Sequence, residues 1–242
     1  MGKARFDFAD QVVIVTGANG NLGSAVADAF AATGASLVLV ARNADRVAEA
    51  LPHLSAASNV MFAPSTDLTD VASVNSMVEK VLDRFGRIHI LANTVGGYRA
   101  GHPVHETAPE AWDFMMALNA RSAFVSSRAV VPSMLDGGYG KIIHTASRAA
   151  LQGSRNAAAY AASKAALLRL TEVLATELKE QDINVNCILP GTLDTQDNRD
   201  AMPNADHSRW VSPEAVAQLF LFLSSDGSKT LHGAAIPAYG LS

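Results

Sequence analysis

The sequence predicts an α/β protein built on a doubly wound parallel sheet, and two observations carry this prediction. Short apolar runs rich in β-branched residues alternate along the chain with longer segments of helical period. The runs are almost continuously apolar, which is typical of parallel strands that helices cover on both faces. The 242 residues, 49% of them hydrophobic, suffice for one large core, so we expect a single domain over residues 1–242.

Seven of the apolar runs are expected to form strands, and helices are expected in the intervals between them. The expected strands cover residues 11–17, 36–42, 60–66, 88–94, 140–147, 183–191 and 233–240. Two of the expected helices lie at roughly 109–135 and 157–180. The long polar stretch without periodicity, residues 192–210, is expected to be a lid or substrate loop, because such stretches inside compact domains often are.

The charge and the cysteine content narrow the range of functions. With 19 basic and 23 acidic residues the net charge is -4, which provides no basic surface of the kind that nucleic-acid binding requires. The single cysteine, Cys187, has no partner for an internal disulfide and is expected to be a small buried hydrophobic residue. The N-terminal segment 1–10 lacks the apolar core of a signal peptide, and no uncharged apolar run approaches the ~18 residues of a membrane span. We therefore expect a cytoplasmic protein that binds a small molecule and neither nucleic acid nor a membrane.

The first expected strand runs into the sequence TGANGNLG, where Gly17, Gly20 and Gly23 surround a tight turn that opens a helix. The backbone N–H groups and the positive end of such a helix can face a pyrophosphate, and glycine permits a close approach that a Cβ would block. A plain strand-to-helix turn would also explain the glycines. The position of the turn after the first strand of a β-α-β pattern favours the binding of a dinucleotide.

The residues after the second expected strand bear on the choice of cofactor. An acidic side chain at this position would bind the adenosine ribose and repel a 2'-phosphate, but the sequence has Ala41 followed by Arg42. Arg42 can pair with the phosphate, although an arginine at the start of a helix can also simply face solvent. The sequence predicts a preference for NADP(H), with NAD(H) as a possible cofactor.

Two further strand ends carry candidate cofactor contacts. After the third strand, Asp67 can accept a hydrogen bond from the adenine amino group while Leu68 packs against the ring. An aspartate here can also cap the helix that follows, but Asp70 is well placed for that role and leaves Asp67 available. The fourth strand ends in ANTVGG, whose glycines suit a backbone that passes close to a cofactor or makes a plain turn.

The most specific pattern in the chain is a Ser, a Tyr and a Lys spaced thirteen and four residues apart, at Ser147, Tyr160 and Lys164. Tyr160 and Lys164 share one face of a helix, and a nearby ammonium is expected to lower the pKa of the phenol by stabilising phenolate. Tyr160 can then exchange a proton with a substrate oxygen while Ser147 hydrogen-bonds the same oxygen and orients it. Chance would produce this spacing only about 0.01 times in such a chain. An Ala-rich packing helix would explain the sequence around Tyr160 but not a serine at the end of a strand.

The segments TGANGNLG, ANTVGG, YAASK and PGTLDT, together with Asn119 and Ser147, resemble the short-chain dehydrogenase/reductase family in their order and spacing. The resemblance extends over nearly the whole chain. It implies a single Rossmann domain with a seven-stranded sheet, a nicotinamide cofactor and a homotetramer or homodimer. It also implies that Tyr160 is the acid and base, that Lys164 binds the nicotinamide ribose, and that Asn119 belongs to a water-linked proton relay.

The cofactor contacts that the resemblance implies come from the ends of the expected strands and from the helix that carries the Tyr and the Lys. They are Gly17, Asn19, Asn21, Leu22, Gly23, Arg42, Asp67, Leu68, Asn93, Gly96, Tyr160, Lys164, Pro190, Gly191, Leu193 and Thr195.

The chain also departs from the family pattern in several places. Asn21 replaces the middle glycine of the T-G-x-x-x-G-x-G motif, and residues 93–96 read NTVG where the family has N-N-A-G. Three segments resemble quinoid dihydropteridine reductase, a divergent member of the family: TGANGNLG, GGYRAG and the stretch 189–210. That enzyme normally has an acidic residue after its second strand and lacks the active-site serine, so Arg42 and Ser147 argue against it.

We therefore expect an NADP(H)-dependent oxidoreductase that acts on a small carbonyl or alcohol, or on a 3-oxoacyl substrate. Two alternatives remain: an activity on a pterin like that of dihydropteridine reductase, and a non-catalytic regulatory protein that binds a dinucleotide. The intact Ser147, Tyr160 and Lys164 favour the enzyme. No metal is expected, because His102 and His105 form a pair without an evident third ligand. Arg99 and Arg148 can border the substrate pocket, although a surface salt bridge is the commoner fate of such arginines.

Overall fold

A computed structural model describes residues 6–241 and contains one sheet of seven parallel strands in the order β3-β2-β1-β4-β5-β6-β7. The predicted doubly wound fold is confirmed. Residues 1–5, on which part of the signal-peptide argument rests, lie outside the described residues. The strands are β1 Val12–Thr16, β2 Ser36–Val40, β3 Val60–Ala63, β4 Ile90–Asn93, β5 Gly140–Thr145, β6 Ile183–Pro190 and β7 Ala235–Ala238.

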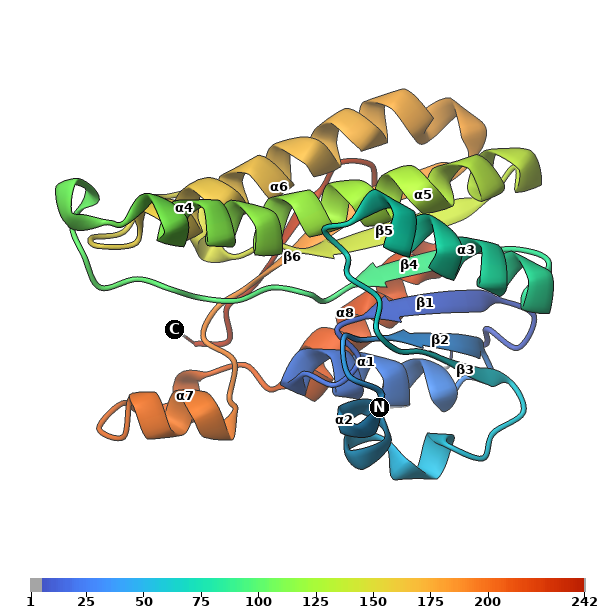
Figure 1. The fold of residues 1–242 in the computed structure, drawn as a ribbon, viewed down its shortest axis with the longest axis horizontal. Helices are drawn as coiled ribbons and strands as arrows, with labels where there is room; N and C mark the ends of the chain where they lie inside the picture. The colour runs from blue at the N-terminus through green and yellow to red at the C-terminus, as the bar shows by residue number, and fades with distance from the viewer. Residues whose placement is uncertain (1–5, 242) are drawn as a thin grey trace.

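Helices cover both faces of the sheet (Figure 1). The helices α1 (Asn21–Ala31), α2 (Ala44–Ala50) and α8 (Pro213–Ser224) lie on one side of it. On the other side lie α3 (Val71–Phe85), α4 (Pro109–Met116), α5 (Ser122–Gly137) and α6 (Ala158–Leu178). The shorter α7 (Gln196–Ala201) stands apart from both layers, next to the carboxyl ends of the strands.

The near-continuous apolar character of the strands follows from this double coverage. In β1, Val13 and Val15 belong to the core cluster under α1 and α8, whereas Ile14 belongs to the cluster under α3 and α5. All eight residues of β6 are buried. Successive side chains of each central strand therefore enter opposite cores, and neither face can be polar.

One long helix expected at roughly 109–135 is divided in the structure. The helix α4 ends at Met116, a π-helical segment spans Ala117–Arg121, and α5 continues from Ser122. The π-helical segment places Asn119 inside the protein with no exposed surface. Hydrophobic periodicity cannot reveal such an extra residue, because the apolar pattern continues on both sides of it.

The stretch 192–210 has more regular structure than its composition suggests. Thr195 caps α7 by accepting a hydrogen bond from the Asn198 backbone N–H at 3.3 Å, and Arg199 forms an ion pair with Asp194 at 2.6 Å. A second short turn, His207–Arg209, begins at Asp206, whose side chain accepts from the Ser208 N–H. Local capping therefore orders a segment without any amphipathic pattern.

The order of the strands reverses between β1 and β4. From β1 the chain builds outward to β2 and β3, and from β4 it builds outward to β5, β6 and β7. The loops that follow β1 and β4 therefore leave the sheet in opposite directions and leave a crevice at the carboxyl ends of the strands, which is where ligands bind in open α/β sheets.

Candidate active site

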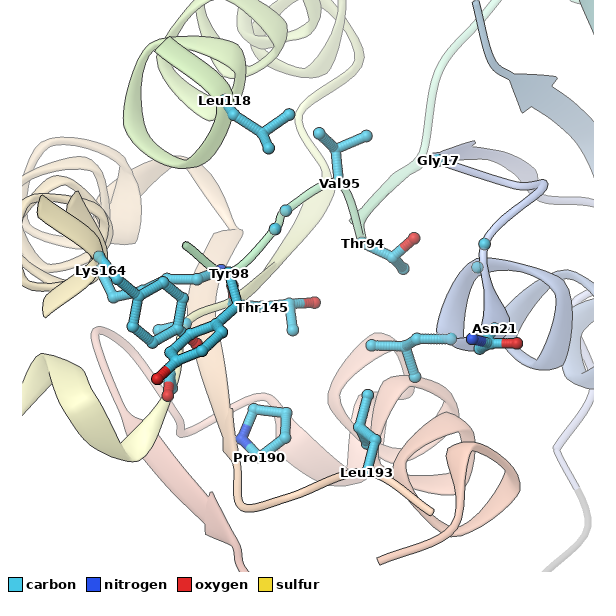
Figure 2. A pocket seen from close by; sticks show the side chains of 18 of the residues that line it. Gly17, Asn21, Thr94, Val95, Tyr98, Leu118, Thr145, Lys164, Pro190 and Leu193 are labelled. Atoms are coloured by element: carbon cyan, nitrogen blue, oxygen red, sulfur yellow. The ribbon is translucent and has the colours of Figure 1, made fainter. Parts of the chain in front are cut away.

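A cleft of about 1200 Å³ occupies this crevice and runs from the glycine turn after β1 to the beginning of α6. Figure 2 shows Asn21 on one side of the cleft and Tyr98 and Lys164 on the other. The structure brings together at this cleft nearly all of the residues for which cofactor contacts were predicted. Those that line it are Gly17, Asn19, Asn21, Leu22, Gly23, Arg42, Asp67, Leu68, Gly96, Tyr160, Lys164, Pro190, Gly191, Leu193 and Thr195.

The glycine turn has the geometry of a phosphate cradle. Gly17 has a φ of 68°, and a Cβ on Gly23 would lie only 2.0 Å from the Gly17 carbonyl oxygen. Neither position can carry a side chain without moving the backbone. The helix α1 begins directly after Gly20 with no side-chain cap, so the first backbone N–H groups of the helix remain available to an anion. These residues fit the diphosphate of a dinucleotide.

The predicted ribose and adenine contacts follow β2 and β3. Arg42 is exposed and lies in the cleft directly after the buried Ala41. Hydrogen bonds from the Thr69 hydroxyl and backbone N–H hold the pKa of Asp67 below its usual range, and the nearby Arg42 charge lowers it further. Asp70 accepts from the Ser73 N–H at 2.7 Å and caps α3, as the sequence predicts.

Asn93 lies beneath the cleft and is not one of the residues that line it. Its side chain accepts from the Thr16 hydroxyl at 2.8 Å, and its amide nitrogen lies 3.2 Å from Nδ1 of His144. His144 is fully buried, and burial together with the nearby Lys164 charge lowers its pKa to about 3. The imidazole is therefore neutral, and Asn93 connects three strands in the core, whereas the sequence predicted that it would contact the cofactor directly.

Ser147, Tyr160 and Lys164 meet at the end of the cleft opposite Arg42. Ser147 follows β5, and the other two side chains project from the first turns of α6. Lys164 is buried, and its Nζ donates a hydrogen bond to the Thr145 carbonyl oxygen at 2.7 Å. The arrangement puts a hydroxyl, a phenol and an ammonium at one site, as the sequence predicts.

The protonation of Tyr160 differs from the expectation. Burial raises the pKa of the Tyr160 phenol, and the hydrogen bond to Ser147 offsets this only in part. The sequence predicted that Lys164 would lower this pKa, but the Lys164 ammonium is directed at Thr145, and its own pKa is lowered to about 8 by burial. Tyr160 is consequently protonated at neutral pH, the state in which it can donate a proton.

Asn119 holds a loop of the site rather than lining it. Its amide accepts from the Gly97 N–H at 3.0 Å, and it donates to the Gly97 carbonyl at 3.1 Å and to the Ser163 hydroxyl at 3.0 Å. Ser163 in turn donates to the carbonyl oxygen of Tyr160. The contacts make Asn119 a positioning residue that joins the loop after β4 to α6, and its part in a water-linked relay stays a prediction.

Several residues at the substrate end of the cleft escaped the sequence analysis. They include Tyr98, Phe114, Leu118 and Met202. Two signals were present in the sequence: Tyr98 comes directly after the two glycines that follow β4, and Met202 lies in the stretch 192–210, which is expected to be a lid or substrate loop. Periodicity offers no signal for Phe114 and Leu118, because apolar residues on α4 and the π-helical segment are expected in a core whether or not a ligand is near.

The two arginines for which the sequence left a place at the substrate pocket open lie in different positions. Arg148 lines the cleft and stacks on the Tyr239 ring at 4.8 Å, whereas Arg99 lies 3.8 Å from the centre of the Phe114 ring and is not a lining residue. In the described part of the chain no group of three His, Cys, Asp or Glu side chains is arranged to hold a metal. None of the helices within residues 6–241 has both the length and the apolar character needed to cross a membrane.

The sequence matches the family model described as short chain dehydrogenase over residues 11–206. The chain belongs to the short-chain dehydrogenase/reductase family. It is an oxidoreductase of the class that acts on alcohol and carbonyl groups, and the match includes the glycine turn, β5 and the part of α6 that carries Tyr160 and Lys164.

Relatives and solved structures agree with this family over nearly the full length. The chain is 31% identical over 233 residues to subunit BbsD of a hydroxy(phenyl)methyl-succinyl-CoA dehydrogenase from Thauera aromatica, covering 93% of each chain. It is 32% identical over 240 residues to D-threitol dehydrogenase from Mycolicibacterium smegmatis, covering 95% of this chain and 92% of the relative. A short-chain dehydrogenase/reductase from Mycobacterium ulcerans has a TM-score of 0.91 and 29% identity, with 97% of this chain and 90% of that chain covered.

The buried Lys164 is expected to cost stability in the cofactor-free protein. Its folded pKa lies at about 8 against an ordinary 10.5, so at neutral pH the fold must hold a desolvated ammonium, which costs roughly 3 kcal/mol. Replacing Lys164 by an apolar residue removes this cost but also removes the hydrogen bond to the Thr145 carbonyl, which stabilises the fold by about 1 to 2 kcal/mol. Lys164→Met should therefore raise the free energy of unfolding by about 1 to 2 kcal/mol at pH 7 while removing the ammonium from the site.

Urea denaturation of the parent and the variant without cofactor measures this difference. It should narrow as the pH rises from about 8 toward 10.5, because only the unfolded parent still holds the proton there. Lys179→Met, an exposed lysine just after α6, is the matched control and should change stability by less than about 0.5 kcal/mol. A Lys164→Met protein that is less stable than the parent at pH 7 would contradict the prediction.

Proposed function

We propose that this protein is an NADP(H)-dependent oxidoreductase that transfers hydride between nicotinamide and a small carbonyl or alcohol substrate, 3-oxoacyl compounds included. The observation that carries the proposal is the cleft itself. It has an anion-binding glycine turn and Arg42 toward one end, and Ser147, Tyr160 and Lys164 at the other. A nicotinamide dinucleotide that extends from the glycine turn to these three side chains would supply the hydride at the end where they meet.

The chain's own residues would hold the substrate oxygen and move its proton. In the direction of reduction, the protonated Tyr160 phenol donates its proton to the carbonyl oxygen as that oxygen gains negative charge. Ser147 donates a second hydrogen bond to the same oxygen and orients it. Lys164 would bind the ribose hydroxyls and then supply positive charge near the phenolate that remains. In oxidation the same groups act in reverse order.

The relatives support the reaction type more than any single substrate. One is named for a hydroxy(phenyl)methyl compound and another for the polyol D-threitol, and the unit shared by the two compounds is a secondary alcohol. A substrate with a single carbonyl or carbinol carbon next to Ser147 and Tyr160 fits the site. The non-catalytic alternative is disfavoured because a protein that only senses a dinucleotide needs no matched proton donor.

A substrate panel tests the proposal directly. Small ketones and alcohols, a 3-oxoacyl thioester and quinonoid dihydropterin are incubated with NADPH or NADH, and the absorbance of the reduced cofactor is followed. We expect turnover of at least one carbonyl compound, with NADPH preferred. Turnover of the dihydropterin alone would establish the pterin activity instead, and binding of cofactor without any turnover would establish the regulatory one.

We further propose that the chain assembles into a homodimer or homotetramer through α4, α5 and α6. These helices expose large apolar side chains, including Trp112 at 43%, Phe124 at 49% and Val173 at 47%. Apolar side chains on neighbouring helices of one layer form a surface that a second subunit can bury. Sedimentation at micromolar concentration should show a dimer or tetramer, and a monomer alone would contradict this.

A further inference from the structure

An unusually exposed tyrosine stands inside the cleft, close to the proton donor. Tyr98 is 68% exposed, yet it lines the cleft and follows directly on Gly97. Figure 2 shows its ring within the cleft, on the same side as Lys164. A large aromatic ring that solvent reaches inside a ligand cleft is available to bury apolar surface when a ligand arrives.

Contacts on both sides hold the loop that carries Tyr98. At Gly97 the loop exchanges two hydrogen bonds with the Asn119 amide, at 3.0 and 3.1 Å. At Gly101 the backbone N–H donates to the Asn156 carbonyl at 2.8 Å. Between these points the Arg99 guanidinium lies 3.8 Å from the centre of the Phe114 ring. The backbone around Tyr98 is thereby fixed to the π-helical segment, to α4 and to the loop before α6.

The ring of Tyr98 also has a defined relation to the catalytic phenol. Its centre lies 4.8 Å from that of the Tyr160 ring, and the two planes meet at 79°. This is the edge-to-face arrangement that aromatic pairs favour. The Tyr98 ring therefore lines the cleft beside the Tyr160 hydroxyl, which must reach the substrate oxygen. Phe114, Leu118 and Met202 add apolar surface to the cleft.

The charges that line the cleft restrict the ligand further. Its two acidic side chains, Asp67 and Asp197, lie toward the cofactor end, where Asp197 accepts from the Asn21 amide at 3.4 Å. The charged side chain that follows Ser147 is Arg148. The substrate end therefore suits a neutral or anionic group and disfavours a cationic one.

We propose that Tyr98 is a specificity-determining residue that favours substrates with a flat, unsaturated ring next to the carbon that exchanges hydride. A flat ring can lie edge-to-face or offset on Tyr98 while its carbonyl oxygen meets Ser147 and Tyr160. A puckered saturated ring with the same number of carbons cannot make that contact over the same area. This inference rests on the proposed function.

Two ketones of equal carbon count, acetophenone and cyclohexyl methyl ketone, test the inference. Their dissociation constants are measured by calorimetry with the NADP+ complex, which lacks a hydride to transfer, and their kcat/KM values are measured with NADPH. The proteins are the parent, Tyr98→Phe, Tyr98→Leu and the control Phe222→Leu, which removes an exposed aromatic ring on α8 outside the cleft.

We expect Tyr98→Leu to reduce the preference for acetophenone in binding about five- to tenfold, which is the range of one aromatic contact. Tyr98→Phe and Phe222→Leu should leave it within about twofold. A preference that Tyr98→Leu leaves unchanged overturns the inference, whatever the turnover. A binding preference that depends on Tyr98 without turnover of either ketone supports the inference for the binding site and contradicts the proposed function.

Discussion

Replacement of Tyr160 by Phe is expected to lower kcat by a factor of roughly 10² or more while leaving cofactor affinity within about twofold. The substitution removes the hydroxyl that would give its proton to the substrate oxygen, and the half-buried ring and its packing against Tyr98 remain. The raised pKa of the phenol means that the parent enters the reaction protonated at neutral pH, so a single missing atom removes the acid. Steady-state kinetics with the best ketone of the panel, together with cofactor titration, measures both quantities.

A matched control separates loss of the proton donor from a general disturbance. Tyr139→Phe removes the same atom from a tyrosine directly before β5, outside the cleft, and should leave kcat within about twofold. Turnover by Tyr160→Phe close to that of the parent would remove Tyr160 from the mechanism and leave the hydroxyls of Ser147 and Tyr98 at this end of the cleft.

The choice of cofactor is expected to depend on Arg42. The parent should bind NADPH roughly 10- to 100-fold more tightly than NADH, because a charge-assisted contact with the 2'-phosphate is available only to the former. The neighbouring Asp67 carboxylate, whose pKa the Thr69 hydrogen bonds and the Arg42 charge hold below its usual range, opposes the phosphate and limits the preference. No basic residue in the glycine turn adds to it, since Asn19, Gly20 and Asn21 are neutral.

Two variants and one control decide this point. Arg42→Ala should largely erase the preference, and the double variant Ala41→Asp with Arg42→Ala should reverse it by repelling the phosphate and accepting the ribose hydroxyls. Arg46→Ala, an exposed arginine on α2 that does not line the cleft, should change neither affinity. Equal affinities of the parent for the two cofactors would show that Arg42 faces solvent.

The fold was predictable from the sequence because two physical signals agree. Every expected strand contains an observed one, since a strand covered on both faces must be apolar at each position. The expected strands are too long at their carboxyl ends, where residues such as Arg42, Ser147 and Gly191 already belong to loops. Those loop residues line the cleft, where the choice of side chain is set less by packing in a core.

The position of a residue at the cleft was predictable where the proposed chemistry requires one residue type at a fixed spacing along the chain, as with Tyr160 and Lys164, which are four residues apart. It was not predictable where several elements meet in space. The contacts of Asn119 with Gly97 and Ser163 join residues 22 and 44 positions apart. The edge-to-face pair of Tyr98 and Tyr160 joins the loop after β4 to α6. The direction of the Lys164 ammonium also depends on the Thr145 carbonyl, which any residue type could supply.

The reversal of strand order between β1 and β4 also separates the residue proposed to select the cofactor from the residue proposed to select the substrate. Arg42 follows β2 on one side of the reversal, and Tyr98 follows β4 on the other. Substitutions at distant sites that share no partner usually contribute additively to free energy. Substitutions in the loop after β4 can then change the preferred substrate without changing the proposed contact of Arg42 with the cofactor. A chain of this kind can therefore acquire a new substrate while it keeps its cofactor.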